Sequence, residues 1–371
     1  MENTEKISSL EAIAFIVIVM INQVTLNIPS SILQTTGSSA WINVIYITIV
    51  AVMFCLLISR LYKPFSNYDI VDISEYLGGK FLKAVVGILY IIMFIGMSAL
   101  ILKYFSECLR LIYYPTTPIL YILGYFVVAT MLASMRGISG IIRNNLILLP
   151  FLLFSIIVIF ASVAKSFVWQ RAFPILGQGV NATFFSGLSN IFAFGGFANI
   201  YFLMPMLKDK KDFKTYSIVG IIISGLYLFL SVISLLLVFS YATTSRQMLA
   251  IYPLARLIEY GRFFQRIDGL FILFWILAAF SYISTNVVLA INIFQKITHV
   301  KNTKALAPCF STLVLGFSLI IGSVADFIFF TDMLHKYYYL VLAFFITPAI
   351  LILANVKWKR KNINTEEAGD Y

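Results

Sequence analysis

The chain has 371 residues, of which 61% are hydrophobic and 12% are charged, and its formal net charge is +11. Soluble proteins carry about 25% charged residues, and a soluble fold would leave much of this apolar excess in water. The composition excludes a disordered chain, a coiled coil and a disulfide-rich secreted scaffold, and it indicates a polytopic membrane protein.

Ten apolar segments are each long enough to cross the hydrocarbon core of a membrane. A crossing takes about 20 residues, and a helix satisfies its own backbone hydrogen bonds there, so we expect an all-α protein with transmembrane helices at these segments. The segments are residues 10–34, 41–61, 84–112, 117–134, 144–163, 184–207, 217–240, 267–295, 306–325 and 336–356. We expect a single transmembrane domain over residues 1–360 and a polar cytoplasmic tail over residues 361–371, disordered from residue 362.

Lysine and arginine gather at the ends of the apolar segments, as at residues 208–214 and 357–361. If the N-terminus lies in the cytoplasm, the cytoplasmic loops hold 18 of these residues and the outer loops hold 7. Basic residues favour the cytoplasmic side and its anionic lipids, so both termini are expected in the cytoplasm. No basic stripe with interleaved aromatic residues lies outside the apolar segments, so no nucleic-acid partner is expected.

The sequence offers no catalytic or metal-ligating pattern. His299 and His335 fall in separate predicted loops, and no P-loop, GxSxG or HExxH motif occurs. Cys55, Cys108 and Cys309 lie in apolar segments without CxxC spacing, which predicts buried side chains with no disulfide. We therefore expect no enzymatic activity, no cofactor and no metal site.

The longest outer loop precedes segment 267–295 and contains an amphipathic stretch, residues 248–267. Apolar and basic residues alternate there at helical spacing. This pattern predicts a helix that lies at the membrane interface or covers a cavity.

The first segment contains a polar interruption between Asn22 and Pro29. Pro29 has no amide hydrogen, so it frees the carbonyl of Thr25, and it disfavours helical dihedral angles at Ile28. The helix is expected to split here, which makes the backbone around Thr25, Asn27 and Ile28 available to a ligand.

The sixth segment contains a second interruption, Phe194-Gly195-Gly196-Phe197, where the glycine pair lowers helicity and lets the backbone open. Both interruptions lie near mid-membrane, in the corresponding helices of two five-helix halves, residues 10–163 and 184–356. Such a pair indicates a transporter with a five-plus-five inverted repeat, in which unwound carbonyls bind cations and half-helix amides bind a carboxylate. The alternative is an ordinary proline kink and a glycine packing notch.

The third segment carries three charged residues, Lys103, Glu107 and Arg110. Charged groups inside a membrane helix usually face protein or water, so they mark a polar pathway or a subunit contact. The alternative, favoured by Pro115 at the helix end, is an ion pair near the outer interface whose long side chains reach water.

Four stretches of the chain carry a family resemblance. They are the first segment with its Pro29, SSAWINV before the second, EYLGGKFLKAVVGILY into the third, and ARLIEYGRFFQRIDGLFILFWILAAFSYIS into the eighth. The most specific piece is Arg266-Ile267-Asp268 followed by Phe271 and Trp275. Together they span nearly the whole chain, which resembles the B-subunit family of endospore nutrient-germinant receptors.

This resemblance implies membership of the amino acid/polyamine/organocation transporter superfamily, with its LeuT-like fold of ten helices and broken helices 1 and 6. It also implies a place in the spore inner membrane beside an A subunit and a C-subunit lipoprotein, and recognition of a small nutrient such as an amino acid. Two positions depart from the family pattern: Thr25 and Asn27 replace glycines common in the first interruption, and Gly196 replaces a common glutamate. The ligand's identity therefore does not carry over.

By the same resemblance, helix eight borders the break in helix one, so Ser281, Ser284 and Thr285 are expected to complete a cation or substrate site, unless they bond back to their own helix. Tyr90 and Phe94, one turn apart in the third segment, are expected to wall the pocket together with Phe197 and Phe344; the alternative is that these aromatic residues face lipid or the core. Asn199, Asn286 and Asn292 lie at membrane depth and need polar partners. The candidate substrate-binding residues are Thr25, Asn27, Ile28, Tyr90, Phe94, Phe194, Gly195, Gly196, Phe197, Ser281, Ser284, Thr285 and Phe344.

The favoured hypothesis is a transporter-like germinant-receptor subunit that binds an amino acid at the interruptions and changes conformation. One rival is a proton- or sodium-coupled amino acid permease, which would have the same fold and pocket. Another is a water or ion conduit within a receptor complex.

Overall fold

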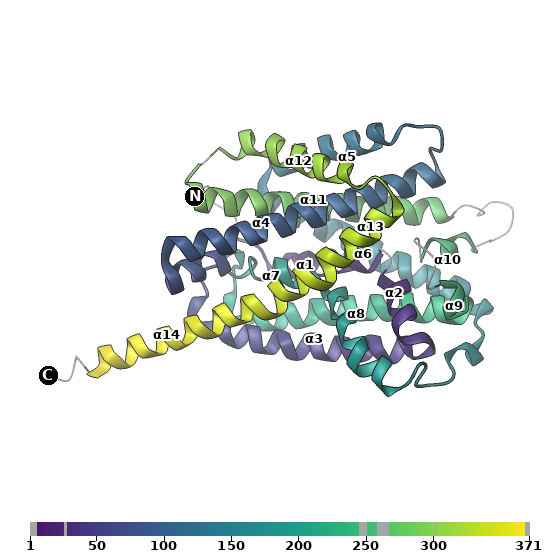
Figure 1. Cartoon of the computed structure of the whole chain (residues 1–371), viewed down its shortest axis with the longest axis horizontal. Coiled ribbons are helices and arrows are strands. Elements are labelled where there is room, and N and C mark those ends of the chain that lie inside the picture. Colours follow the sequence, from purple (N-terminus) through teal and green to yellow (C-terminus); the bar gives the residue numbers. More distant parts are fainter. Residues whose placement is uncertain (1–5, 26–27, 245–250, 258–266, 301, 368–371) are drawn as a thin grey trace.

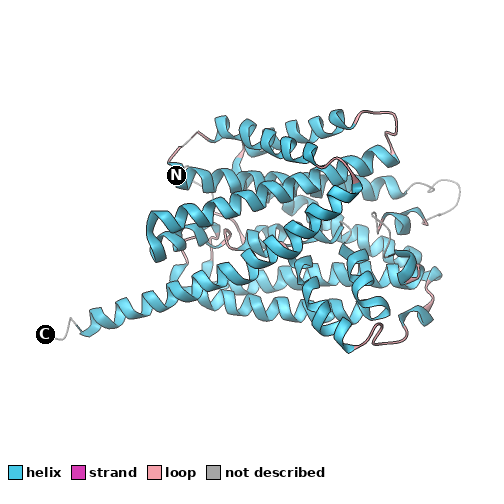
Figure 2. Ribbon diagram, viewed as in Figure 1, coloured by secondary structure: helices cyan, strands magenta, loops and turns pink. Residues whose placement is uncertain are grey.

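The computed structural model describes residues 6–25, 28–244, 251–257, 267–300 and 302–367. Within these ranges every regular element is a helix, and one isolated β-bridge joins Ile7 to Leu207 (Figure 2). The long α-helices pack side by side in a bundle (Figure 1). They are α1 (Ser9–Thr25), α2 (Ile28–Thr36), α3 (Ala40–Tyr62), α4 (Ile70–Ile112), α5 (Ile119–Ser134), α6 (Gly137–Val163), α8 (Phe213–Val238), α11 (Ile267–Thr298), α12 (Thr303–Ile320), α13 (Val324–Thr331) and α14 (Thr347–Glu367).

Short helices connect or interrupt the long ones. The α-helical ones are α7 (Phe197–Ile200), α9 (Tyr241–Thr244) and α10 (Tyr252–Arg256). The 3-10 helices are η1 (Gly37–Ser39), η2 (Lys63–Phe65), η3 (Ala164–Ser166), η4 (Trp169–Ala172), η6 (Ser186–Phe194), η7 (Met204–Met206) and η8 (Lys210–Asp212). The π-helices are η5 (Asn181–Phe185), η9 (Asp332–Tyr339) and η10 (Leu342–Ile346).

Seven helical stretches of the described chain are long and apolar enough to cross a membrane, which makes this a multi-pass membrane protein. They are Ile28–Phe65, Ile70–Ile112, Gly137–Ser166, Lys210–Val238, Ile272–Thr298, Thr303–Ile320 and Tyr337–Asn362. The other three predicted segments fall on shorter or irregular elements: α1, whose neighbour α2 belongs to the stretch Ile28–Phe65, then α5, and the run from η5 to η7. The count of ten stays a prediction.

α4 begins at Ile70, well before the predicted start of the third segment at residue 84. Asp69 accepts hydrogen bonds from two amides of the first turn, and Asp72 accepts one from the Asp69 amide, which forms a capping box. Gly79 has a φ of +72°, so Ile70–Leu77 is a short helix that precedes the membrane-crossing part. Hydropathy alone missed it because it is half polar.

The last membrane-crossing segment is irregular and longer than the predicted residues 336–356. It runs from α13 through the π-helices η9 and η10 into α14. α14 continues to Glu367, so the prediction of disorder from residue 362 is wrong as far as Glu367. The helix extends because lysine, arginine and glutamate favour helix, and adding residues to a formed helix costs little.

α1 is the enclosed centre of the bundle. Its residues from Ala14 to Asn22 each expose at most 1% of their surface. α1 packs against α6, α8 and α11, and α11 also packs along α4. The helix that carries the first predicted interruption is thus surrounded by protein, while α5 and α12 lie together at one edge (Figure 1).

The amphipathic stretch and the cysteines can be compared with the structure only in part. The amphipathic stretch 248–267 is described only over residues 251–257, which include α10, and at Ile267; Arg266 lies outside the described residues. Cys55 and Cys108 are buried, whereas Cys309 is exposed. The prediction for Cys309 is wrong because α12 lies at the edge of the bundle, where this side chain is left uncovered.

Candidate functional site

The first predicted interruption coincides with the boundary between two helices. α1 ends at Thr25 and α2 begins at Ile28, with Pro29 in its first turn, where a missing amide hydrogen costs nothing. Ile28 is buried. Asn27 lies outside the described residues, and of Thr25 only the backbone is described.

The second predicted interruption lies in an irregular stretch. The π-helix η5 leads into the 3-10 helix η6, the chain turns at Gly195 and Gly196, and the four residues of α7 follow. Phe194 and Phe197 flank the turn and are each 1% exposed. The short, tight elements leave backbone groups near the turn without the regular pairing of an α-helix.

The second interruption packs directly against α1. A Cβ built on Gly196 would lie 2.6 Å from Met20 Cγ, 2.9 Å from Val19 Cγ2 and 3.1 Å from the Met20 amide nitrogen. Only glycine allows an approach this close between two backbones. The Met20 side chain fills the space beside Gly196, so the two elements are closed against each other.

An asparagine pair bridges the irregular stretch and α11. Asn199 in α7 donates its side-chain amide to Asn286 Oδ1 over 2.9 Å, and both residues are buried. The amide nitrogen of Asn286 has no hydrogen-bond partner. The sequence predicted that these two residues need polar partners, and they partner each other; they were not among the candidate binding residues.

The three hydroxyls of α11 are all buried but differ in their partners. Ser281 donates to the side-chain oxygen of Asn145 on α6. Ser284 and Thr285 hydroxyls have no partner, so neither bonds back to a carbonyl of its own helix. Buried polar groups are nearly always satisfied, so a ligand, ion or water that reached these two hydroxyls would gain hydrogen bonds there.

Asn22 joins α1 to α11 about one turn before Ser281. Its side-chain nitrogen donates to the carbonyl oxygen of Ala278 over 2.8 Å and to that of Ile18 over 3.0 Å. Sequence reasoning did not select Asn22 or Asn145 as site residues. The signal was present, because both are polar residues in apolar segments.

The predicted aromatic wall divides into two clusters. Tyr90 and Phe94 have ring centroids 5.8 Å apart, and Phe202 lies 5.0 and 5.6 Å from them. Phe197 and Phe344 lie 5.4 Å apart, and Phe54 lies 5.3 and 4.8 Å from them. The residues expected to share one wall are therefore distributed over two contacts, and sequence reasoning missed Phe54 and Phe202.

Tyrosines join the irregular stretch to the last span. The amide of Ala198 donates to the Tyr339 hydroxyl over 2.9 Å, and the Tyr201 hydroxyl donates to the Ala343 carbonyl over 2.6 Å. On the other side, the Tyr62 hydroxyl donates to the Tyr201 carbonyl over 2.9 Å. These buried tyrosines carried no sequence signal, because the chain has 21 tyrosines.

A cluster of charged residues lies near the start of α4. Lys296 Nζ at the end of α11 lies 2.5 Å from Asp69 Oδ2 and 2.5 Å from Asp72 Oδ2. Burial raises the pKa of the Asp69 carboxyl, and the neighbouring ammonium of Lys296 opposes that rise. The cluster joins α4 to α11 and lies apart from the hydroxyls above.

The charges of the third segment form a connected cluster. Lys103 Nζ lies 3.3 Å from Glu107 Oε1, and Arg110 lies 2.7 Å from Glu107 Oε2. The expected ion pair is present, but only Arg110, with 40% of its side chain exposed, reaches outward; Lys103, with 11%, is enclosed by protein.

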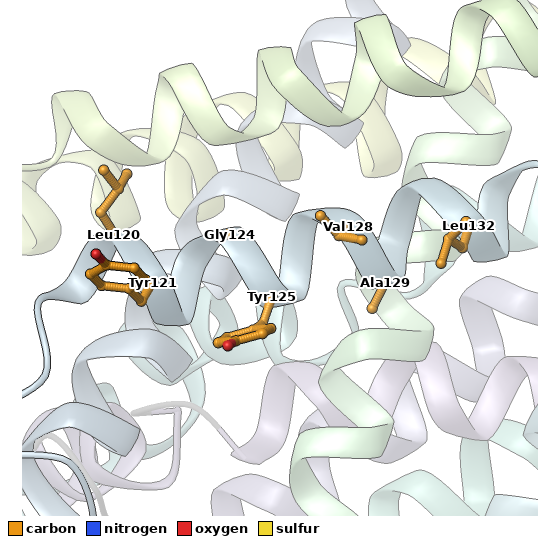
Figure 3. A pocket seen from close by; sticks show the side chains of 7 residues that line it. All are labelled: Leu120, Tyr121, Gly124, Tyr125, Val128, Ala129 and Leu132. Carbon is orange, nitrogen blue, oxygen red and sulfur yellow. The ribbon is translucent and has the colours of Figure 1, made fainter.

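A shallow apolar groove of about 470 Å³ lies on α5, away from both interruptions. Figure 3 shows that all its lining side chains come from that one helix. They are Leu120, Tyr121, Gly124, Tyr125, Val128, Ala129 and Leu132. The groove is lined by none of the candidate binding residues, so it is not the candidate site.

One protein family matches most of the chain. Its sequence model, described as spore germination protein, covers residues 6–325. Spore germination protein KB of Bacillus subtilis (strain 168) is 26% identical over 263 residues, which are 69% of this chain and 70% of that protein. Spore germination protein A2 of the same strain is 22% identical over 354 residues, 93% of this chain and 94% of that protein.

Solved structures of transporters share the fold. Mhp1, a nucleobase-cation-symport-1 family transporter with bromovinylhydantoin bound, matches with a TM-score of 0.66 at 12% identity, over 89% of this chain and 75% of its own. MhsT in complex with L-phenylalanine matches with a TM-score of 0.61 at 14% identity, over 92% and 97%. Because the family match covers most of the chain, this multi-pass membrane protein with a transporter fold belongs to the spore germination protein family.

Proposed function

We propose that this protein is the transporter-like B subunit of a spore nutrient-germinant receptor. An amino acid binds near mid-membrane, where the irregular stretch around Gly196 meets α1, and its binding triggers germination. Family membership and the shared transporter fold support the general role. The observation that carries the site is the direct contact of Gly196 with Val19 and Met20, because it brings the two interrupted segments together.

The buried polar groups of α11, one of them bonded to Asn199 of α7, suit an amino acid. Asn286 offers a buried amide nitrogen without a partner, and Ser284 and Thr285 offer two buried hydroxyls. Neutral donors and acceptors bind a zwitterion without the cost of a buried fixed charge. The Met20 side chain would have to move to admit the ligand, and methionine is flexible enough to do so.

Binding acts by shifting a conformational equilibrium. The contact between Met20 and Gly196 closes the site, so an amino acid must favour a second conformation in which the two interrupted segments separate. The size of the shift is limited by the difference in the ligand's affinity for the two conformations. The protein's role is recognition without catalysis, and it needs no cofactor.

The wider arrangement follows the family. We place ten transmembrane helices in a five-plus-five inverted repeat, with both termini in the cytoplasm and the chain in the spore inner membrane. The partners are an A subunit and a C-subunit lipoprotein. Cross-linking in spores would test this assembly, and labelling of a cysteine introduced at Lys359 from the cytoplasmic side only would test the orientation of the C-terminus.

The binding test is ligand-dependent stabilisation of the purified chain in lipid nanodiscs. The probes are the twenty standard amino acids, each added alone at millimolar concentration. We expect at least one to raise the unfolding temperature of the unsubstituted chain. Asn286→Ala should abolish that rise, while the matched control Asn292→Ala, on the same helix but only half-buried, should keep it. A rise that Asn286→Ala leaves unchanged would contradict the proposed site.

A cation-coupled amino acid permease is the second candidate. The observation that favours it is the pair of unpartnered hydroxyls on Ser284 and Thr285, because hydroxyl oxygens are hard ligands of the kind that bind sodium. Uptake of an amino acid into proteoliposomes by this chain alone, driven by a sodium or proton gradient, would establish it. If the chain binds the amino acid without uptake, the receptor role stands. Ligand-independent conductance would instead indicate a conduit.

A further inference from the structure

The last span contains two π-helices. η9 ends at Tyr339, η10 covers Leu342–Ile346, and α14 follows without a gap. The Thr347 hydroxyl donates to the carbonyl of Leu342, five residues earlier, over 2.8 Å, which matches the π-helical repeat. π-Helices are rare, and they cost stability relative to an α-helix unless surrounding contacts hold them.

Those contacts lie along one face of the span, at positions 339, 343 and 347. Tyr339 accepts the amide hydrogen of Ala198 over 2.9 Å, and the Ala343 carbonyl accepts the hydroxyl of Tyr201 over 2.6 Å. Thr347 shares a hydrogen bond of 2.7 Å with Tyr90. These three bonds fix the span to the irregular stretch and to α4, and they hold only in one register.

The hydrogen bond between Ala198 and Tyr339 depends on the conformation of the interruption at Gly196. Ala198 is the second residue of α7, and its amide, close to the start of that helix, has no carbonyl one turn back. The Tyr339 hydroxyl satisfies it, and both residues are at most 1% exposed. Any movement at Gly196 that redirects the Ala198 amide breaks this hydrogen bond. Water does not reach the site, so it cannot replace the lost partner.

The same span continues into one long helix. α14 runs from Thr347 to Glu367 and projects beyond the other helices (Figure 1). Asn355 donates to the Leu61 carbonyl over 2.8 Å, and Lys357 donates to the carbonyls of Tyr76 and Leu77 over 2.7 and 3.1 Å. These bonds also specify one rotational position of α14.

We propose that Tyr339 is a positioning residue that couples the interruption at Gly196 to the projecting end of α14. When the interruption moves, the Tyr339 bond to Ala198 breaks and the π-helical turns relax towards an α-helix. A register change of one residue turns α14 by about 100° and displaces a surface side chain on it by about 8 Å. The bonds of Asn355 and Lys357 are then exchanged for others.

The coupling rests on the proposed function in one respect: in that proposal, ligand binding is what moves the interruption at Gly196. It can be tested without a ligand, so its failure and that of the proposed binding site are distinguishable. A structural role for Tyr339 would lower stability and leave the position of α14 unchanged. A coupling role moves the end of α14 in the folded protein.

The test measures the distance between spin labels on the full chain in lipid nanodiscs without any added ligand. The labels are placed on Lys63→Cys at the end of α3 and Lys359→Cys on α14, in a Cys309→Ser background; Cys55 and Cys108 are buried. Tyr339→Phe should produce a second distance population, shifted by several ångströms. Tyr62→Phe, which removes a buried hydroxyl bond of 2.9 Å to the Tyr201 carbonyl but none to the last span, should not.

A Tyr339→Phe distribution that superimposes on that of the parent would overturn the proposal, as would an equal shift in Tyr62→Phe. If Tyr339→Phe does not fold, Thr347→Val takes its place, because it removes the bond to Tyr90 and the π-type bond to Leu342. Hydrogen exchange then supplies the second measurement. Faster exchange in residues 332–346 together with a shifted distance supports the coupling, and an unshifted distance overturns it.

Discussion

Gly196 in the irregular stretch and Met20 on α1 are in van der Waals contact so close that a single added carbon does not fit. A Cβ on Gly196 would stand 2.6 Å from Met20 Cγ and 3.1 Å from the Met20 amide nitrogen. A flexible side chain can move away, but the backbone cannot. The contact therefore holds two interrupted segments together and closes the site that we propose for the ligand.

Gly196→Ala should destabilise the protein by about 1 to 3 kcal/mol, because overpacking forces neighbouring atoms to shift. Gly220→Ala on α8 is a matched control: its Cβ would meet Ile16 on the same central helix at 2.6 Å, away from Gly196. Unfolding in a denaturant series should give similar losses for the two variants. A neutral Gly196→Ala would mean that α1 moves aside freely.

Removing Lys296 should be costly because it leaves two carboxylates facing each other. Lys296→Met should lower stability by about 3 kcal/mol, the lower end of the range for a broken buried ion pair, since 24% of the lysine side chain is exposed. Lys83→Met breaks the pair with Glu75, whose side chain is 38% exposed, and should cost about 1 kcal/mol or less. Equal losses for the two variants would contradict a special role of the Lys296 cluster.

The pair of Asn199 and Asn286 should show coupling in a double-mutant cycle. Asn286→Ala leaves a buried amide without its acceptor, which costs about 1 to 3 kcal/mol. Once Asn199 is also alanine, no unpaired partner remains, so the double variant should lose less than the sum of the two single losses. Additive losses would show that the two side chains do not interact.

Gly79 and Gly124 should respond to alanine in opposite directions, although neither has a neighbouring atom within 4 Å of an added Cβ. Gly79 has a φ of +72°, so Gly79→Ala should cost about 1 to 2 kcal/mol. Gly124 lies inside α5, where Gly124→Ala should stabilise the helix by up to about 1 kcal/mol. Thermal unfolding of the two variants measures the contrast, and stabilisation by Gly79→Ala would contradict the bend assigned to it.

Hydropathy predicted the regular spans well. Segment 41–61 corresponds to α3 (Ala40–Tyr62) and segment 217–240 to α8 (Phe213–Val238), because a long uncharged run has no other stable form in a membrane. It failed where polar residues build structure outside the membrane, as in Ile70–Leu77 and the end of α14. The π-helices of the last span depend on tertiary hydrogen bonds, which no local pattern encodes.

The candidate site was predictable only in part. Polar residues in apolar segments pointed to Ser281, Ser284 and Thr285, and the same criterion applied fully would have added Asn22 and Asn145. Which side chains meet could not be predicted, because contacts between helices depend on their packing. For this reason the aromatic residues expected in one wall lie in two clusters, and Met20, an ordinary apolar residue in sequence, occupies the contact with Gly196.

Equilibrium binding of the stabilising amino acid to Gly196→Ala and Gly220→Ala tests the central claim most directly. Both variants press an extra carbon against α1, but only one does so at the interruption. The proposed site predicts that Gly196→Ala changes the affinity at least tenfold per folded molecule while Gly220→Ala binds like the parent chain. Equal affinity in the two variants, whether retained or lost, would contradict binding where the two interrupted segments meet.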